Sequence, residues 1–236
     1  MKTNQAQKIR INISGDVDTL PQLNRYQFPE IYSGSYGHQG NDKLGKGISV
    51  INRPAGIAFT CPGESKFCIE CYAKKGNFKR YNIQLKYQTE IIKLPKKIRK
   101  FFRIHVSGDY DTIEYINDII QLVTSEPDTY FWGYTRSWII PELLPALEAL
   151  RKLPNMQLFA SCDETMPLPP TDWRIAGIQG DDRITGLVCP FEQCSAQCPD
   201  NCNHTKRTNH VPKLPDCKTC KYCFIKQKGN VLFVLK

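Results

Sequence analysis

Apolar residues recur along this chain in two patterns that alternate with each other. Short apolar runs predict buried β-strands at 47–51, 103–109, 130–134, 156–161, 174–178 and 185–188. Between these runs, apolar residues recur at helical spacing in two segments, 113–123 and 141–152. The sequence Asp111-Thr-Ile-Glu114 has the spacing of a capping box, which would open the first of these helices.

Strands that alternate with helices indicate βαβ units and a parallel sheet. With five or six strands, we predict an α/β fold in the form of a partial or complete βα-barrel rather than a sandwich. The pattern divides the chain into an N-terminal arm (1–45), a barrel-like core (46–188) and a cysteine-rich tail (189–236). The arm is polar, with one possible strand over 9–13. The tail has little apolar periodicity, so we expect bound metal to staple its fold, and 231–235 to return to the core.

Basic residues are concentrated in one segment of the chain. The chain of 236 residues has a formal net charge of +9, and residues 74–103 contain eleven Lys or Arg and one acid, Glu90. This segment contains interleaved aromatic residues, among them Tyr81, Tyr87, Phe101 and Phe102, which is typical of a surface that contacts nucleic acid. The alternative is a solvated basic helix over 79–101 with a buried aromatic stripe.

Several classes of protein are disfavoured by the sequence. No apolar run approaches the roughly 20 residues of a membrane span, and the residues after Met1 lack the apolar core of a signal peptide. We therefore expect a cytoplasmic chain with no membrane partner. The sequence has no P-loop, dinucleotide glycine fingerprint, nucleophile elbow or HExxH motif, which argues against the enzymes that these motifs mark.

Polar side chains follow the predicted strands at their carboxyl ends. In βα-barrels the active site forms at this edge, although polar loops also follow strands in proteins without a site there. The candidate catalytic residues are Asp109, Arg136, Ser137, Asp163 and Glu164, and Asp181 and Asp182 belong to the same predicted edge.

Eleven cysteines in a cytoplasmic chain favour metal or iron–sulfur ligation over disulfides. Cys61, Cys68 and Cys71 are spaced C-x6-C-x2-C in the loop after the first core strand. Four thiolates would saturate a zinc ion or a cubane cluster, whereas three hold a [4Fe–4S] cluster and leave one iron open. The alternative is zinc, for which His105 could supply a fourth ligand.

The tail holds seven more cysteines, and their grouping is open. The run Cys217-x2-Cys220-x2-Cys223, with the distant Cys189 followed by proline, has the ligand pattern of bacterial ferredoxins and predicts a second cluster. Structural zinc is the alternative at these four residues. A further site, more typical of zinc, could use Cys194, Cys198, Cys202 and either His204 or His210.

A second partition of the tail fits the sequence equally well. In it, Cys189 joins Cys194, Cys198 and Cys202, and the last three cysteines form another site. Cys162 stands apart from both groups, as an isolated thiol on the predicted edge or as a buried free cysteine.

Seven segments together resemble the phage "gene product 88" domain family. They are residues 43–49, 54–56, 60–63, 71–73, 103–109, 132–137 and 161–163. The resemblance spans roughly 43–225 and includes Cys189 and the C-x2-C-x2-C run. It implies an iron–sulfur-binding protein of a phage or mobile element, located in the host cytoplasm, and implies little about its substrate.

The cysteine loop is also similar to that of radical S-adenosylmethionine (SAM) enzymes. That similarity implies SAM at the open iron, with Ser107, Gly108 and Asp109 as the turn that holds its methionine amine. We therefore expect an iron–sulfur protein which, if it is an enzyme, binds SAM or another small molecule at the first cluster. The rivals are a non-catalytic nucleic-acid-binding protein with structural iron–sulfur or zinc sites, and a simple electron carrier.

Overall fold

The computed structural model describes residues 36–39, 43–45, 47–56, 60–75, 100–197, 215–225 and 229–234, without the side chains of 36–39 and 194–197. The strand predicted over 9–13 lies outside these residues, as do Cys198, Cys202, His204 and His210. Residues 79–99 of the predicted helix also lie outside them, and its last residue, Phe101, belongs to a strand. Most of the basic segment 74–103 also lies outside them, so its role in binding nucleic acid stays a prediction.

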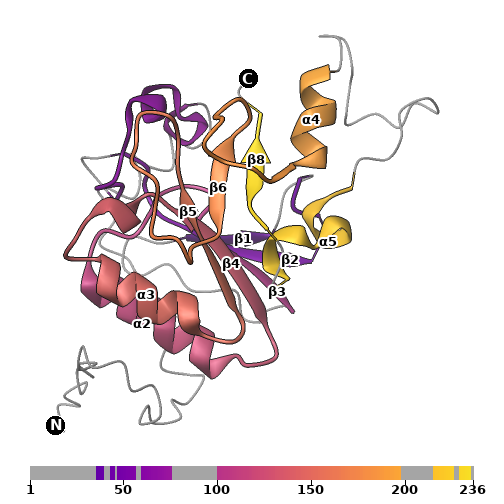
Figure 1. The fold of residues 1–236 in the computed structure, drawn as a ribbon. Coiled ribbons are helices and arrows are strands. Elements are labelled where there is room, and N and C mark those ends of the chain that lie inside the picture. The colour runs from indigo at the N-terminus through magenta and orange to yellow at the C-terminus, as the bar shows by residue number, and fades with distance from the viewer. Residues whose placement is uncertain are drawn as a thin grey trace, which may run out of the picture.

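A single sheet organises the described part of the chain (Figure 1). Its eight described strands run in the order β1-β2-β3-β4-β5-β6-β8-β7. β1 is antiparallel to β2, and the other neighbours are parallel. The strands are β1 (Tyr36–Gln39), β2 (Ile48–Asn52), β3 (Phe101–Ile104), β4 (Tyr130–Thr135), β5 (Met156–Ser161), β6 (Ile175–Ile178), β7 (Leu187–Val188) and β8 (Val231–Phe233).

Two helices cover one face of this sheet. α2 (Ile113–Ser125) connects β3 to β4, and α3 (Leu144–Lys152) follows the short 3-10 helix η4 (Ser137–Ile139) and leads to β5. Because successive strands are neighbours and parallel crossovers are right-handed, consecutive helices fall on the same face. Figure 1 shows α2 and α3 side by side there. Their apolar stripes pack on Phe102, Phe131 and Leu158 in the largest core cluster.

The first helix begins one residue later than the capping box predicts. Thr112, and not Asp111, is the N-cap, and its hydroxyl oxygen accepts a hydrogen bond from the Tyr115 amide at 3.1 Å. The third helical position is therefore Tyr115, which cannot return the bond that Glu114 would make in a capping box.

The tail covers the opposite face of the sheet. It contributes α4 (Pro190–Gln197), α5 (Cys217–Cys220) and the 3-10 helix η5 (Tyr222–Phe224). Trp132 alternates with Phe131 along β4 and so points to this face. The Phe224 ring lies 4.8 Å from the rings of both Trp132 and Phe101, measured between centroids. Aromatic packing therefore holds the tail to the inner strands.

The tail also completes the sheet. β8 inserts between β6 and β7 and pairs in parallel with both, which confirms that residues near 231 return to the core. Arg174 fixes the chain just before β8. Its guanidinium lies 4.2 Å from the Phe159 ring centroid and donates to the Gly229 carbonyl oxygen at 2.9 Å.

The α/β class predicted from the sequence is confirmed, with seven parallel strands among those described. Consecutive strand order with helices on one face is the winding of a βα-barrel. Among the described residues, however, no pairing joins β1 to β7. A closed barrel, a radical-SAM fold, a metal-stapled tail and the three-part division of the chain therefore stay predictions.

Replacing Phe224 by alanine tests the packing of the tail. Phe224 is 3% exposed, and its loss should cost about 3–5 kcal/mol of unfolding free energy because a cavity would open against Trp132. Chemical denaturation followed by tryptophan fluorescence measures this. The matched control is Ile225→Ala, since Ile225 is 40% exposed and should change stability by about 0.5 kcal/mol or less. Equal stability of the two variants would contradict this packing.

Candidate functional site

The first cysteine loop follows β2 and folds into two short 3-10 helices, η2 (Lys66–Glu70) and η3 (Tyr72–Lys74). Cys68 lies in η2, and Cys71 joins η2 to η3. The amide of Cys68 donates to the Ser65 carbonyl oxygen at 3.0 Å, and that of Cys71 to the Cys68 carbonyl oxygen at 3.2 Å. These three-residue turns set the distance between the two thiols of the C-x2-C spacing.

Glycine allows this loop to pack closely on the end of β4. A Cβ atom at Gly63 would collide with the carbonyl oxygen of Arg136. On the other side, the Thr60 hydroxyl donates to the Pro54 carbonyl oxygen at 2.7 Å and accepts from the Asp109 amide at 3.2 Å. The Tyr72 hydroxyl donates to the Val106 carbonyl oxygen. The loop is thus attached to the chain segments that follow β3 and β4.

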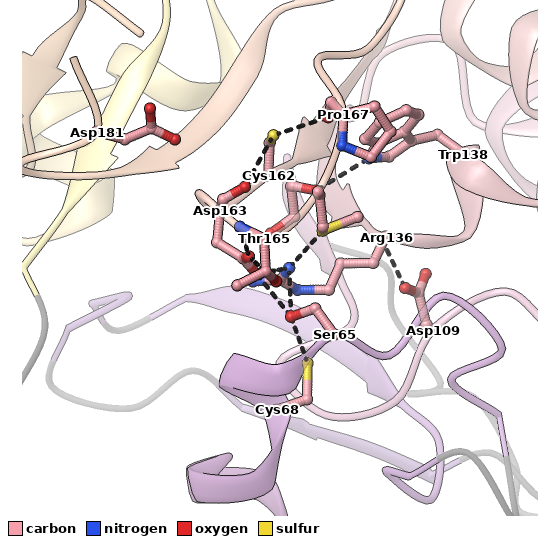
Figure 2. A network of polar contacts seen from close by, with 12 residues as sticks. Ser65, Cys68, Asp109, Arg136, Trp138, Cys162, Asp163, Thr165, Pro167 and Asp181 are labelled. Carbon is pink, nitrogen blue, oxygen red and sulfur yellow. Dashed lines mark hydrogen bonds and ion pairs between the residues drawn. The ribbon is translucent and has the colours of Figure 1, made fainter. Parts of the chain in front are cut away.

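A partly buried ion pair connects the same loop to the end of β5. Arg136 forms an ion pair with Asp163 and donates to the Ser65 hydroxyl at 3.0 Å. Ser65 in turn donates to Asp163 at 2.6 Å, and its hydroxyl lies 3.8 Å from the Cys68 sulfur. Figure 2 shows these side chains converging below Cys162. We call Ser65, Arg136 and Asp163 the rim triad.

Thr165 also stabilises the rim triad through hydrogen bonds to Asp163. Asp163 accepts hydrogen bonds from the amide and hydroxyl of Thr165 at 2.9 and 2.6 Å. Burial alone would raise the pKa of Asp163, but the hydrogen bonds from Ser65 and Thr165, together with the Arg136 charge, hold it below its usual value. Asp163 is therefore ionised at neutral pH, as its pairing with Arg136 requires.

Asp109 is a second buried carboxylate at this edge. It accepts from the Thr135 hydroxyl at 2.6 Å and from the Arg136 amide at 2.8 Å. Burial raises the pKa of Asp109 to about 6, although these hydrogen bonds oppose the shift. Its carboxyl group therefore titrates closer to neutral pH than an ordinary aspartate.

The thiols of the loop lie in a partly buried and negatively charged setting. Burial raises the pKa of Cys61 to about 12, and the charges of Asp109, Cys71 and Cys68 add to this effect. Burial also raises the pKa of Cys71. The Gly56 amide donates to the Cys61 sulfur at 3.2 Å, which opposes this rise in the pKa of Cys61 without cancelling it.

The other candidates at this edge have different environments. Ser107 donates through its hydroxyl to the Arg53 carbonyl oxygen at 3.0 Å. Gly108 has a φ of +81° and packs against Arg53, which leaves no room for a side chain. Ser137 is buried, and Asp181 is paired with Arg183. Glu164 and Asp182 are exposed.

His105, the possible fourth ligand of a zinc site, is buried and engaged with two tyrosines. Its Nε2 atom lies 2.7 Å from the Tyr115 hydroxyl, and its ring contacts those of Tyr110 and Tyr115. This is the arrangement of a buried histidine held by a hydrogen bond.

Ser65, Thr60 and Arg183 were missed by sequence reasoning. Ser65 lies inside the cysteine loop, but nothing in the local sequence indicates that its hydroxyl reaches a strand end 98 residues away.

In the tail, four cysteines line one surface pocket. They are Cys189, Cys217, Cys220 and Cys223. Cys189 is fixed at the end of β7 by its amide, which donates to the Leu232 carbonyl oxygen at 2.8 Å. Burial raises the pKa of Cys217 to about 12, with the charge of Cys223 adding to the effect. The predicted ligands of a second site are thus brought to one place.

Among the described residues, no group of three or more His, Cys, Asp or Glu side chains is arranged to hold a metal ion. The thiol donors suit a soft metal or an iron–sulfur cluster, but the ligand sets stay predictions. The same part of the chain has no helix that is both long and apolar enough to cross a membrane.

Comparison with known proteins finds similarity to phage gene 88 proteins. A family model described as gene product 88 matches residues 89–226, more than half of the chain. The gene 88 protein of Mycobacterium phage L5 is 25% identical over 225 residues, covering 82% of this chain and 89% of that protein. The gene 88 protein of Mycobacterium phage D29 is 29% identical over 149 residues, covering 52% and 60%. No solved structure matches the chain.

The environment of Asp109 predicts an unusual titration. Its carboxyl carbon, observed by NMR, should titrate near pH 6, whereas an ordinary aspartate titrates near 3.8. Thr135→Val should raise the pKa further, because it removes a donor to the charged form. Since the folded chain holds this proton more tightly than the unfolded chain, the resulting stabilisation is complete below about pH 4 and is lost as the pH rises through about 6.

The internal control for this titration is Asp172. Its hydrogen bond from Arg151 lowers the pKa of that exposed carboxyl group. If Asp109 and Asp172 titrated together, burial would not be the dominant effect at Asp109.

Proposed function

The chain belongs to the gene product 88 family, and we propose that it is an iron–sulfur protein with a catalytic centre at the carboxyl edge of its sheet. A [4Fe–4S] cluster would be held there by Cys61, Cys68 and Cys71. The family relationship supports a phage origin for the chain. The chemistry proposed here is similar to that of radical-SAM enzymes.

One observation carries the proposal: the three-cysteine loop is attached to the carboxyl ends of successive parallel strands. Gly63 packs against the end of β4, and the rim triad joins the loop to both β4 and β5. Ligands in α/β folds bind at this edge of the sheet. A loop that only carried electrons or structural zinc would not need this position.

The donor set fits an iron–sulfur cluster better than a single zinc ion. A zinc–sulfur bond of about 2.3 Å brings tetrahedral thiolates to about 3.8 Å from one another. A cluster places its own iron and sulfide atoms between the thiolates and so accepts cysteines that stand farther apart. When bound by three thiolates, it supplies an open iron for SAM or another small ligand, and an electron.

Within this proposal, the rim triad positions the loop. Arg136 and Asp163 already satisfy each other, so a ligand that contacted either would have to break a partly buried ion pair. Ser65 connects that pair to the turn that contains Cys68. We assign these three residues to orientation of the cluster loop.

We assign the remaining candidate residues to ligand binding. Glu164 is exposed beside Asp163 and can contact a ligand without disturbing the triad. Ser107, Gly108 and Asp109 form the turn that would face the amine of a methionine moiety. With a pKa near 6, Asp109 can hold or release a proton close to neutral pH.

Metal analysis of single variants tests the proposal. Anaerobically prepared wild-type protein should contain iron and acid-labile sulfide, and Cys68→Ser should lose about four iron atoms per chain. The matched control is Cys162→Ser, because Cys162 is buried at the same edge and bonds to the Pro167 carbonyl oxygen. Mössbauer spectroscopy measures the cluster directly. Stoichiometric zinc without sulfide, or equal iron in both variants, would sink the proposal.

A ligand titration tests the open iron. Adding SAM to reduced wild-type protein should change the paramagnetic resonance spectrum of the cluster, and Cys68→Ser should abolish that change. Glu164→Gln should weaken the response, while Glu142→Gln, another exposed acid, should leave it unchanged. A fourth protein side chain on the iron, with a spectrum insensitive to any ligand, would exclude catalysis.

A further inference from the structure

The geometry of the tail points to a second, closed four-thiolate site formed by Cys189, Cys217, Cys220 and Cys223, and we propose that it holds a [4Fe–4S] cluster of its own. The sequence leaves Cys189 with two possible sets of partners. The structure brings it together with the last three cysteines, from a position 28 residues before Cys217. This site is independent of the rim site, and either proposal can fail alone.

Local structure explains how three of these thiols face one space. Asp216 caps α5 by accepting from the Thr219 amide at 2.7 Å, so Cys217 and Cys220 lie one turn apart on the helix. Lys221 has a left-handed φ of +60°, which reverses the chain and brings Cys223 back toward the same side.

Backbone hydrogen bonds fix both halves of the site to the sheet. The Cys217 amide donates to the Lys43 carbonyl oxygen at 2.8 Å, just before β2. Cys189 directly follows β7, and its amide is bonded to the Leu232 carbonyl oxygen of β8. The fourth thiol therefore comes from a different part of the chain but from a fixed position.

The space between the thiols suits a cluster. Besides the four cysteines, the pocket is lined by Leu187, Pro190, Phe191, Pro215, Tyr222, Phe224 and Val231. Its walls are mostly apolar and four cysteine sulfurs lie among them, which is the kind of lining that thiolate-bound iron–sulfur clusters have. A single ion would require the sulfurs to converge on one point, and the described residues contain no such group.

Positive charge lies where a cluster would need it. Arg103 stacks on Tyr134 at 4.2 Å from the ring centroid, on the face of the sheet that the tail covers. Arg174 stacks on Phe159 and donates to the Tyr222 carbonyl oxygen at 3.2 Å, one residue before Cys223. A cluster with four thiolates is an anion, and anions in apolar surroundings need such partners. With four protein ligands, this site has no iron open to substrate.

The test uses full-length protein in which Cys61, Cys68 and Cys71 are all serine. This background should retain about four iron and four sulfide per chain. Adding Cys189→Ser should remove nearly all of it, whereas Cys194→Ser, five residues away, should leave it unchanged. If Cys194→Ser also loses the iron, the other partition, in which Cys189 joins Cys194, is correct. Retention of the iron by Cys189→Ser would overturn the site itself. Zinc in place of iron would overturn the cluster.

A second measurement leaves the tail sequence unchanged, so its result does not depend on whether a tail variant folds. In the same background, alkylation under native conditions, read by mass spectrometry, should spare Cys189, Cys217, Cys220 and Cys223 and modify Cys194. After the iron is removed with an oxidant and a chelator, all five should react. Modification of Cys189 while the iron remains bound would overturn the assignment. Loss of iron from the wild type on replacing the rim cysteines reports only on the rim site, so the two proposals are separated.

Discussion

A parallel sheet must be covered on both faces, and this constraint shapes the whole molecule. β2 is buried along its entire length, and β5 along all but its last residue. Consecutive right-handed crossovers place α2 and α3 on one face, and within the part of the chain that the structure describes no crossover helix lies on the other. The tail covers that second face, although it offers few apolar residues. Its Phe224 packs on Trp132, and on the sheet the rings of Tyr134 and Phe159 are each covered by an arginine.

The same winding separates two chemical environments. At the carboxyl edge, the rim triad and Asp109 bind the first cysteine loop through charged and hydroxyl groups, partly accessible to solvent. On the tail-covered face, cysteines line an apolar pocket beside stacked arginines. An edge with polar contacts suits a site that exchanges ligands, whereas an apolar pocket lined by four thiols suits a permanent group.

Most of the sheet could be predicted from the sequence, because buried parallel strands appear as short apolar runs with the right spacing. The runs at 130–134 and 156–161 correspond to β4 and β5 almost residue for residue. β1 was missed, since Tyr36–Gln39 has no apolar alternation and depends on its antiparallel partner. The sequence indicated the charged residues of the candidate site, such as Arg136 and Asp163. It did not indicate Ser65, because the contacts of a hydroxyl group depend on tertiary structure. The position of β8 is likewise a long-range pairing that no local pattern encodes.

That position of β8 has a consequence for how the protein is made. β7 pairs only with β8 among the described strands, so it has no partner until residues 231–233 have been synthesised. During translation β6 therefore remains an unprotected edge for more than 50 residues of further chain growth. Such an edge is a template for pairing with another nascent chain. Synthesis at high rates, as in an infected cell, would favour aggregation at this step and make the final strand insertion the point at which yield is decided.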